Sequence, residues 1–512
     1  MGNNLTLSSN AKCFDHINKD LPDITFTQQL GNGYFLKTAK CAYTDGPIVA
    51  KIYPKANLEA KNTFVEDLVG HHEANLTHIR NQLSENCYNV CPFQKFVETK
   101  TNLYLMRQYF FNNLRDRIET RPYLKQTELI WIAYLILKGL EEAHSRGICH
   151  GDMKLENIML TSWNWLYITD FASYKPVFIP DDESFSFSYY FDTSGTRSCY
   201  LAPERFESSS QPKAENPKLT QQMDVFSAGC IIAELFSDGP LFTYAELLNY
   251  SGRRNEATYD PSSKLNRIPQ KSVRKLVQRM IQRNPDDRGT ISEYLNNWIG
   301  LGFPSYFPEL YSDILSLMRM DPDGKILKIK QDFNKLKSQF RLHQKANQKK
   351  AGGTKFSPKS QVNKLSSSMR FQSQSSVNAN LTSSIYGRDT ESFVISVEKE
   401  EKADDLSQSQ LGSTTYFQEL EVRAPPSPAR SPVPEKEQHP GMVNLLSVVC
   451  ASIHNVISDN IKLDAIELFV WFGEALDDKC RLQRIVPYLI SLLRDPSGPV
   501  RAAVIVALVK VL

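Results

Sequence analysis

The 512-residue sequence lacks several features that would each indicate a particular class of protein. Its nine cysteines are scattered, and only Cys87 and Cys91 lie close together, so no second pair completes a zinc site and reduced thiols are expected. The amino terminus, MGNNLTLSSN, has no apolar core of the kind that a secretory signal requires. No uninterrupted apolar run approaches the ~18 residues that would span a bilayer. The sequence therefore predicts a chain that is soluble or is attached to membranes by other means.

A strong excess of charge of one sign is also missing. The chain has 60 Lys and Arg residues against 57 Asp and Glu residues, which gives a formal net charge of +3. This balance gives no indication of nucleic acid as a partner. Hydrophobic residues make up 41% of the chain, enough for real cores, and the length predicts roughly three domains of about 150 residues each.

Composition and periodicity divide the chain into segments. We expect a flexible amino terminus at 1–20, a globular domain at 21–315, and a basic amphipathic helical segment at 316–342. Residues 343–440 are rich in Ser, Gln, Asn and Lys and end in a Pro-rich stretch. Such a segment buries too little apolar surface to offset chain entropy, so we predict a disordered linker there. Apolar periodicity returns in 441–512 as helices.

The carboxyl-terminal helices pair as helix–turn–helix units of roughly 35 to 40 residues, which is the period of HEAT repeats. The stretch DPSGPVRAAVIVAL, with Asp495, Val500 and Arg501 at a helix start, also resembles that repeat. Units of this kind bury their faces by stacking on neighbours. We therefore expect an incomplete array, and a chain that is a shortened form of a longer protein.

The stretch LGNGYFLKTA is typical of a loop that covers phosphates. Gly31 and Gly33 fit a glycine-rich loop, and Phe35 is placed to cap the phosphates, but Leu36 stands where a third glycine would be. A plain hairpin turn explains two glycines equally well. The assignment therefore depends on the motifs that follow it.

Lys51 lies in IVAKIY, a predicted strand after this loop. In a kinase the lysine at this place grips the α- and β-phosphates and needs a glutamate from the next helix. Glu73 is the preferred glutamate and Glu66 the alternative, because the spacing does not decide between them. By itself, a lysine in a strand is most often a surface residue.

The strongest signal is HGDMKLEN, followed by WLYITDFA. Asp152 would orient the acceptor hydroxyl, and Lys154 would steady the transferring phosphate. Asn157 would hold a second Mg²⁺ ion, and Asp170, at the end of a predicted strand, would hold the main one. This order and spacing predict phosphoryl transfer from ATP and Mg²⁺.

Further residues support a kinase fold. YLAPERF contains Glu204, and NPDDR ends in Arg288, a suitable partner for that glutamate. Asp224, in DVFSAGC, fits the helix that braces the catalytic loop. Together these motifs predict an α+β chain with a bilobal protein-kinase fold, followed by a disordered linker and an α-helical solenoid of HEAT repeats.

Two positions depart from the usual kinase pattern. Gly151 replaces the arginine of H-R-D, which in many kinases contacts a phosphate on the activation segment. Ala172 replaces the glycine of D-F-G, and its Cβ resists the positive φ values that glycine permits. Neither change removes a group that handles phosphate. The segment DDESFSFSYYFD (Asp181–Asp192) is expected either to plug the substrate groove or to form a surface loop with some aromatic packing.

These motifs, together with RQYFFNNLRDRIETRPYL and TRSCYLAPERF, resemble the vacuolar-protein-sorting protein kinases that serve as regulatory subunits of the class III phosphatidylinositol 3-kinase. HGD and DFA are the usual forms in that family. The resemblance covers about residues 1–320 and the helical pairs at 442–512. Family members continue with more HEAT repeats and a WD40 propeller, so the resemblance implies a truncated form.

The resemblance also implies function. It implies a non-specific Ser/Thr protein kinase that uses ATP and Mg²⁺, and whose main role is to scaffold the lipid kinase. The implied partners are the catalytic subunit of the class III phosphatidylinositol 3-kinase and its autophagy and endosomal adaptor subunits, with no nucleic acid. The implied location is cytoplasmic and peripheral on late endosomes and autophagosome-related membranes.

Membrane attachment has two candidate signals. MGNNLT fits the myristoylation pattern with Gly2 as the acceptor, and the resemblance strengthens this match. One myristoyl chain binds only marginally, with a constant on the order of 10⁴ M⁻¹, so a second signal is expected. Ile326–Lys350 offers one, because Ile329, Phe333, Leu336 and Phe340 share one face of a basic helix. The alternative, which we favour, is that this face packs on the kinase domain or the helical array.

Two functions remain open. The chain is either an active Ser/Thr kinase that transfers phosphate at Asp152 or a nucleotide-binding scaffold. Retention of Lys51, Asp152, Asn157 and Asp170 favours nucleotide binding, and Gly151 and the aromatic activation segment favour low turnover on outside substrates. We expect a kinase-fold regulatory subunit with weak or restricted transfer activity, and the alternative is a catalytically inactive nucleotide-binding scaffold.

Overall fold

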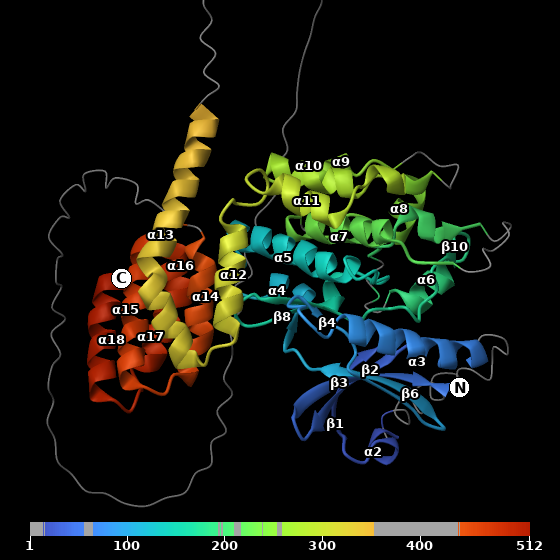
Figure 1. Cartoon of the computed structure of the whole chain (residues 1–512), viewed down its shortest axis with the longest axis horizontal. Coiled ribbons are helices and arrows are strands. Elements are labelled where there is room, and N and C mark those ends of the chain that lie inside the picture. Colours follow the sequence, from blue (N-terminus) through green and yellow to red (C-terminus); the bar gives the residue numbers. More distant parts are fainter. Residues whose placement is uncertain are drawn as a thin grey trace, which may run out of the picture. The chain divides into compact units, whose positions relative to one another are not determined.

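In the computed structural model, the described residues are 14, 16–55, 65–192, 195, 198–208, 217–237, 239–252, 259–352, 439 and 441–512, without the side chains of 65–72 and 339–352. Gly2 and most of the predicted linker therefore lie outside the described residues. The predicted bilobal kinase fold is confirmed, with a sheet-based amino-terminal lobe and a helical carboxyl-terminal lobe (Figure 1).

The amino-terminal lobe is built on an antiparallel sheet in the order β1-β2-β3-β6-β5. Its strands are β1 (Thr25–Asn32), β2 (Lys37–Tyr43), β3 (Gly46–Pro54), β5 (Lys95–Glu98) and β6 (Asn102–Gln108). The helices of this lobe are α2 (Ile17–Asp20) and α3 (Val65–Gln82). Tyr104 and Met106 of β6 point into a core on one face of the sheet, whereas Leu105 faces the opposite side. That opposite side is the one on which the candidate site lies.

The carboxyl-terminal lobe surrounds α5 and α7, which are buried along nearly their whole length. Its helices are α4 (Leu114–Glu119), α5 (Gln126–His144), α6 (Ser184–Tyr190), α7 (Gln221–Leu235), α8 (Tyr244–Ser251), α9 (Ser262–Leu265), α10 (Lys271–Met280), α11 (Ile291–Trp298) and α12 (Phe307–Met318). Its strands are β4 (Val90–Cys91), β7 (Asn112–Asn113), β8 (Ile158–Leu160), β9 (Leu166–Thr169), β10 (Ile179–Pro180) and β11 (Phe206–Glu207). The order β4-β9-β8-β7 forms a small sheet that carries the catalytic segments.

A close approach between α5 and β9 sets the position of that small sheet. A Cβ at Gly139 would lie 2.8 Å from the carbonyl oxygen of Asn89 and 2.8 Å from a side-chain carbon of Ile168. Only glycine therefore allows α5 to pack this tightly against β9. Because Asp170 follows β9 directly, this contact also helps to place the carboxylate of Asp170.

The predicted α-helical carboxyl-terminal region is also confirmed. It comprises α13 (Pro322–Gly352), α14 (Met442–Ser452), α15 (Asp459–Ala475), α16 (Asp478–Cys480), α17 (Val486–Leu492) and α18 (Gly498–Val511), with a π-helical turn at Arg481–Ile485. Helix α13 continues past residue 342, where the linker was predicted to begin. The Lys- and Gln-rich sequence there lacks apolar residues but keeps good helix propensity, which a prediction from composition overlooks.

The first part of α13 lies against the carboxyl-terminal helices (Figure 1), and its apolar side chains are buried there. Ile329, Phe333 and Leu336 are all buried, and the ring of Phe333 lies 5.0 Å from that of Trp471 and 5.3 Å from that of Phe472. Lys330 pairs with two acidic side chains of α15. Of the two alternatives for this helix, the structure supports packing on the helical array. The side chain of Phe340 lies outside the described residues.

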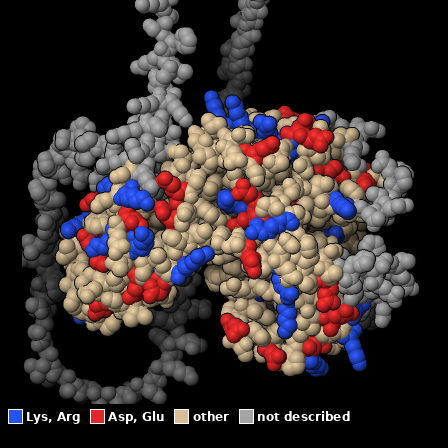
Figure 2. Space-filling model, viewed as in Figure 1, with Lys and Arg blue, Asp and Glu red and all other residues tan. Residues whose placement is uncertain are grey.

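The described surface agrees with the balanced composition. On the face shown in Figure 2, Lys and Arg side chains are interspersed with Asp and Glu rather than gathered into one patch. Among the described residues, no helix is both long enough and apolar enough to cross a membrane.

Candidate active site

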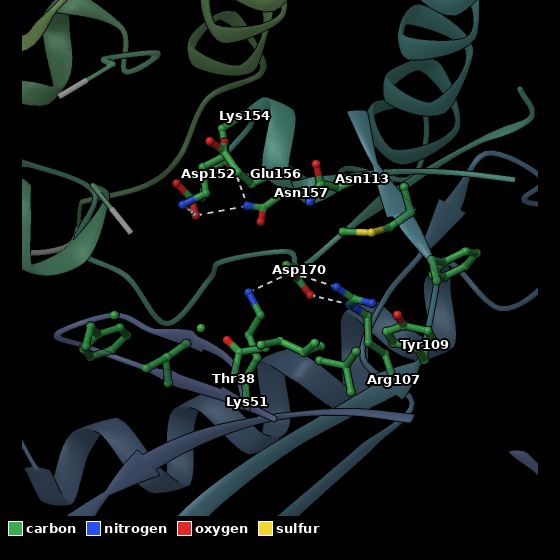
Figure 3. Close-up of a pocket in the computed structure, with 18 of the residues that line it drawn as sticks. Thr38, Lys51, Arg107, Tyr109, Asn113, Asp152, Lys154, Glu156, Asn157 and Asp170 are labelled. Atoms are coloured by element: carbon green, nitrogen blue, oxygen red, sulfur yellow. Dashed lines mark hydrogen bonds and ion pairs between the residues drawn. The ribbon is translucent and has the colours of Figure 1, made fainter. Parts of the chain in front are cut away.

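A cavity of about 380 Å³ lies between the two lobes. It is lined by the sequence-predicted residues Gly31, Gly33, Lys51, Asp152, Lys154, Asn157 and Asp170. The structure therefore brings most of the predicted phosphate-handling residues together in one place. Figure 3 shows Lys51 reaching Asp170 from the sheet, with Asp152, Lys154 and Asn157 across the pocket.

Lys51 is directed into this cavity by the sheet. It lies in β3 and pairs in register with Leu105 of β6. Its Nζ lies 2.7 Å from Oδ2 of Asp170. The preferred glutamate partner, Glu73, lies in α3 with an exposed side chain, and no ion pair between Glu73 and Lys51 is recorded in the described residues. The side chain of the alternative, Glu66, lies outside the part of the chain that the structure describes.

Asp170 is held by a second cation. Arg107, at the end of β6, donates from Nε to Oδ1 of Asp170 at 2.7 Å and from Nη2 to Oδ2 at 3.2 Å. Burial raises the pKa of Asp170, but Arg107 and Lys51 outweigh that effect and hold the pKa well below its usual range. Asp170 is therefore a buried, ionised carboxylate with both oxygens engaged.

Sequence reasoning missed Arg107 as a member of the site. The signal was present in NLYLMRQ, where a charged residue interrupts a strand on the same face as Leu105. A charged side chain that is only 4% exposed requires a partner of opposite charge. Neither feature of the sequence names Asp170 as that partner, because the two residues are far apart in the chain.

Asp152 is also held by two cations. Its Oδ2 lies 2.7 Å from Nζ of Lys175 and 3.3 Å from Nζ of Lys154. Burial raises the pKa of Asp152, but Lys154 and Lys175 lower it to about 2. Burial lowers the pKa of Lys175 to about 7, and the nearby Asp152 offsets this only in part. No motif in the sequence assigns Lys175 to the site, although it lies only five residues after Asp170.

Asp224 holds the backbone of the catalytic loop in place. The carboxylate of Asp224 accepts hydrogen bonds from the backbone N–H groups of His150, at 2.7 Å, and Gly151, at 2.9 Å. Gly151 adopts a φ of +79°, and a Cβ there would lie 2.6 Å from a methyl carbon of Leu219. Glycine at this position therefore suits both the left-handed backbone and the close packing.

Glu204 and Arg288 form the pair that the sequence predicted. The guanidinium of Arg288 is fully buried and donates to both carboxylate oxygens of Glu204, at 2.7 and 2.8 Å. This two-pronged contact joins the end of the activation segment to the helical lobe. Both residues lie away from the cavity, in a supporting position.

The activation segment folds over the mouth of the cavity. Its aromatic stretch forms α6, and the ring of Phe35 in the glycine-rich loop lies 5.1 Å from the ring of Tyr190 and 5.7 Å from that of Tyr189. The carbonyl of Phe191 accepts a hydrogen bond from Lys154 Nζ at 3.2 Å. The segment thus has the aromatic packing of a surface loop and also covers the predicted site.

The kinase fold implies Mg²⁺ at Asp170 and Asn157, and the carboxylate of Asp170 does not fit a metal ion in this arrangement. Both oxygens of Asp170 accept from Arg107 and Lys51. The amide nitrogen of Asn157 donates to the backbone carbonyl of Asp152 at 2.8 Å and to its carboxylate at 3.1 Å, and these bonds leave the amide oxygen, the atom that would bind a metal ion, unused. Within the described ranges, no cluster of three or more His, Cys, Asp or Glu side chains is arranged to hold a metal ion.

Known protein families match both the two lobes around this cavity and the carboxyl-terminal helices. The protein kinase domain family matches residues 24–299, more than half of the chain, and the family described as PIK3R4-like, middle domain, matches residues 445–512. A crystal structure of Rad53 1-466 in complex with AMP-PNP matches weakly, with a TM-score of 0.40 and 20% identity over 54% of this chain and 64% of that chain.

Several curated relatives are similar over long stretches. The Serine/threonine-protein kinase VPS15 of Arabidopsis thaliana is 33% identical over 524 residues, covering 100% of this chain and 34% of the relative. A probable vps15 kinase of Dictyostelium discoideum is 40% identical over 330 residues, which cover 64% of this chain and 16% of that relative. The VPS15 kinase of Saccharomyces cerevisiae is 31% identical over 507 residues, which cover 96% of this chain and 32% of that relative.

The chain thus spans about a third or less of the length of these relatives. Their names confirm the resemblance to the vacuolar-protein-sorting kinases. With the kinase motifs gathered around one cavity and a family match over most of both lobes, the chain belongs to the protein kinase family.

Proposed function

We propose that this chain is a regulatory subunit of a class III phosphatidylinositol 3-kinase complex whose Ser/Thr kinase fold binds ATP and transfers phosphate weakly or on few substrates. The observation that carries the proposal is the state of the two aspartates in the cavity. Asp152 and Asp170 are both present, and each is already paired with two cations. The site thus retains phosphate-handling groups while restraining the groups that transfer needs.

The cavity supports nucleotide binding. Lys51, Lys154 and Lys175 line it together with the glycine-rich loop, and cationic side chains on a strand and a loop are suited to phosphate oxygens. The cavity lies between the lobes of a kinase fold, which is where kinases bind their nucleotide. A family match to the protein kinase domain supports the same class of ligand.

Restricted transfer follows from two contacts. Lys175 and Lys154 lower the pKa of Asp152 to about 2, so the carboxylate is a weak acceptor for the proton of a substrate hydroxyl while these contacts persist. Helix α6 would also have to move from the mouth of the cavity before a protein substrate could approach. Mg²⁺, if it is used, would require Asp170 to exchange a cationic partner for the metal.

The scaffold part of the proposal rests on the carboxyl-terminal helices. They match the PIK3R4-like middle domain, and the curated relatives carry the name VPS15. We propose that these helices stack as HEAT repeats and bind the lipid kinase subunit and its autophagy or endosomal adaptors. We further propose that a myristoyl group on Gly2 brings the complex to late endosomal and autophagosome-related membranes.

The test of function is phosphate transfer from labelled ATP by the purified chain in magnesium buffer, with Asp152→Asn as the matched variant. Both proteins are also assayed for nucleotide binding. We expect both to bind nucleotide, and only the wild type to label itself or a partner, at a low rate. Absence of binding in both would contradict the proposal.

A second candidate function is a nucleotide-binding scaffold with no transfer. The pairing of Asp152 with both Lys175 and Lys154 is the observation that favours it. The same assay separates the two functions. Binding without any transfer by the wild type, with the lipid kinase subunit present, would select this second candidate.

A further inference from the structure

Arg107 makes a contact that the chemistry of a kinase does not require. Its side chain is only 4% exposed and lines the cavity. Nε and Nη2 reach the two oxygens of Asp170, and Nη1 donates to the carbonyl oxygen of Gln108 at 3.1 Å. A planar guanidinium that binds both oxygens of a carboxylate is more strongly oriented than a single ammonium contact. Arg107 is therefore fixed on Asp170 from the wall of the pocket (Figure 3).

The carboxylate of Asp170 has little capacity left for a metal ion. Oδ2 accepts from Lys51 and from Arg107, and Oδ1 accepts from Arg107. Two cations on one carboxylate leave a net positive charge at the place where the fold would hold the metal. An incoming divalent cation would meet that charge at short range in a poorly solvated site. Displacing the guanidinium would also leave a buried charge without its partner.

The opposite wall of the cavity repeats this arrangement. Lys175 and Lys154 lie at 2.7 and 3.3 Å from the carboxylate of Asp152. Asp116 and Glu156 also line the cavity, and Glu156 is paired with Arg115 at 3.3 Å. Phosphate groups that enter between Asp152 and Asp170 therefore meet two cations on each side.

We propose that the site holds the phosphates of a nucleoside triphosphate without a divalent metal ion, and that Arg107 takes the place of the metal on Asp170. The proposal rests on the nucleotide binding proposed above and specifies how the phosphates are held. In it, Asp170 is a positioning residue that orients Lys51 and Arg107 toward the phosphates. The low transfer activity has the same origin, because the carboxylate that would hold the metal is already neutralised.

The test is a titration of the full chain with a fluorescent ATP analogue, once in EDTA and once in excess Mg²⁺. For the wild type, we expect the two Kd values to agree within about threefold, a difference below ~1 kcal/mol. For Arg107→Met, we expect affinity in EDTA to fall by about tenfold or more, and Mg²⁺ to restore it because Asp170 is released. The matched variant Arg107→Lys keeps the charge and is expected to remain independent of the metal.

Binding of Mn²⁺ is a second readout, and it is detected through the paramagnetic effect of the ion on the bound analogue. We expect the wild-type complex to take up no Mn²⁺ and the Arg107→Met complex to bind it. If the wild type binds the analogue only with Mg²⁺, this inference is overturned while the proposed nucleotide binding stands. If it binds in neither buffer, both are overturned. Should Arg107→Met fail to fold by circular dichroism, the wild-type comparison in the two buffers still decides.

Discussion

Lys175 is the residue in the site whose charge is most sensitive to pH. Burial lowers its pKa to about 7, although Asp152 lies 2.7 Å away. The other charged groups around it are Lys154 and Lys51, which also disfavour its protonated form. Below pH 7 the amine is charged in the free protein and attracts phosphate. Above pH 7 it is neutral in the free protein, while bound phosphate would restore its proton.

Nucleotide binding should therefore be accompanied by proton uptake above pH 7. Affinity for a triphosphate is expected to be constant below about pH 7 and to fall above it, by up to about tenfold per pH unit. Calorimetric titration in two buffers of different ionisation enthalpy measures the uptake directly. Lys175→Met should lose the effect, whereas Lys55→Met, at a lysine that directly follows β3 and pairs with Glu98, should keep it. The same slope in Lys175→Met would show that another group titrates.

At the scale of single residues, the sequence predicted the main side chains of the candidate site but not the residues that pair with them. Lys51, Asp152, Asn157 and Asp170 were found because motif spacing encodes a local loop or strand end. Arg107 and Lys175 were missed because their roles depend on contacts with residues far along the chain. The same holds for Glu73, whose side chain is exposed, since the orientation of α3 decides where that side chain lies. Tertiary packing, rather than local pattern, sets these pairings.

At the scale of elements, α6 of the activation segment packs against the glycine-rich loop. The sequence left a plug and a surface loop equally open for Asp181–Asp192. The ring contacts of Phe35 with Tyr189 and Tyr190 show that α6 covers the loop, and Tyr174 stacks on the same ring at 6.2 Å. Aromatic pairs of this kind contribute roughly 0.5–1.5 kcal/mol each. Their sum is small enough for α6 to open at a moderate cost.

Removing one of these rings should shift α6 toward the open state. Tyr190→Ala is expected to accelerate nucleotide association by about two- to tenfold, which is the change that loss of its pair with Phe35, the one that joins α6 to the glycine-rich loop, allows. Stopped-flow fluorescence with the ATP analogue measures this rate. The control is Phe185→Ala, because Phe185 is 56% exposed and stacks only at the edge of the cluster, on Tyr189. An unchanged rate in Tyr190→Ala would mean that α6 does not limit entry.

Element prediction succeeded where sequence periodicity reports burial. The buried helix around Asp224, which is α7, and the strand that ends before Asp170 followed from the apolar residues and the order of the kinase motifs. The end of α13 did not, because a prediction from composition reports the absence of a core and not the helix propensity of Lys and Gln. Packing of its apolar face on the kinase domain or the helical array was the favoured alternative, and Phe333 contacts Trp471 of α15.

At the scale of the whole molecule, a buried ion pair joins the carboxyl-terminal helices to the kinase fold. Arg484 donates to both carboxylate oxygens of Glu128 at the start of α5, at 2.6 and 2.7 Å, and to the carbonyl of Tyr123 at 3.0 Å. Glu128 is fully buried and also accepts from Asn164 at 2.8 Å. No spacing in the sequence indicates this pair, because its members belong to segments predicted as separate domains. The pair thus links the helical array directly to the kinase lobe.

Breaking this pair should uncouple the two parts. Arg484→Met leaves the carboxylate of Glu128 buried without its guanidinium, which is expected to destabilise the chain by about 3–5 kcal/mol. Scanning calorimetry should then resolve separate transitions for the helical array and the kinase lobe, whereas we expect a single transition for the wild type. The matched control is Lys125→Ala, whose partner Asp477 is 37% exposed, so its loss should cost ~1 kcal/mol or less. A single transition at the wild-type midpoint in Arg484→Met would show that apolar packing alone holds the array on the kinase lobe.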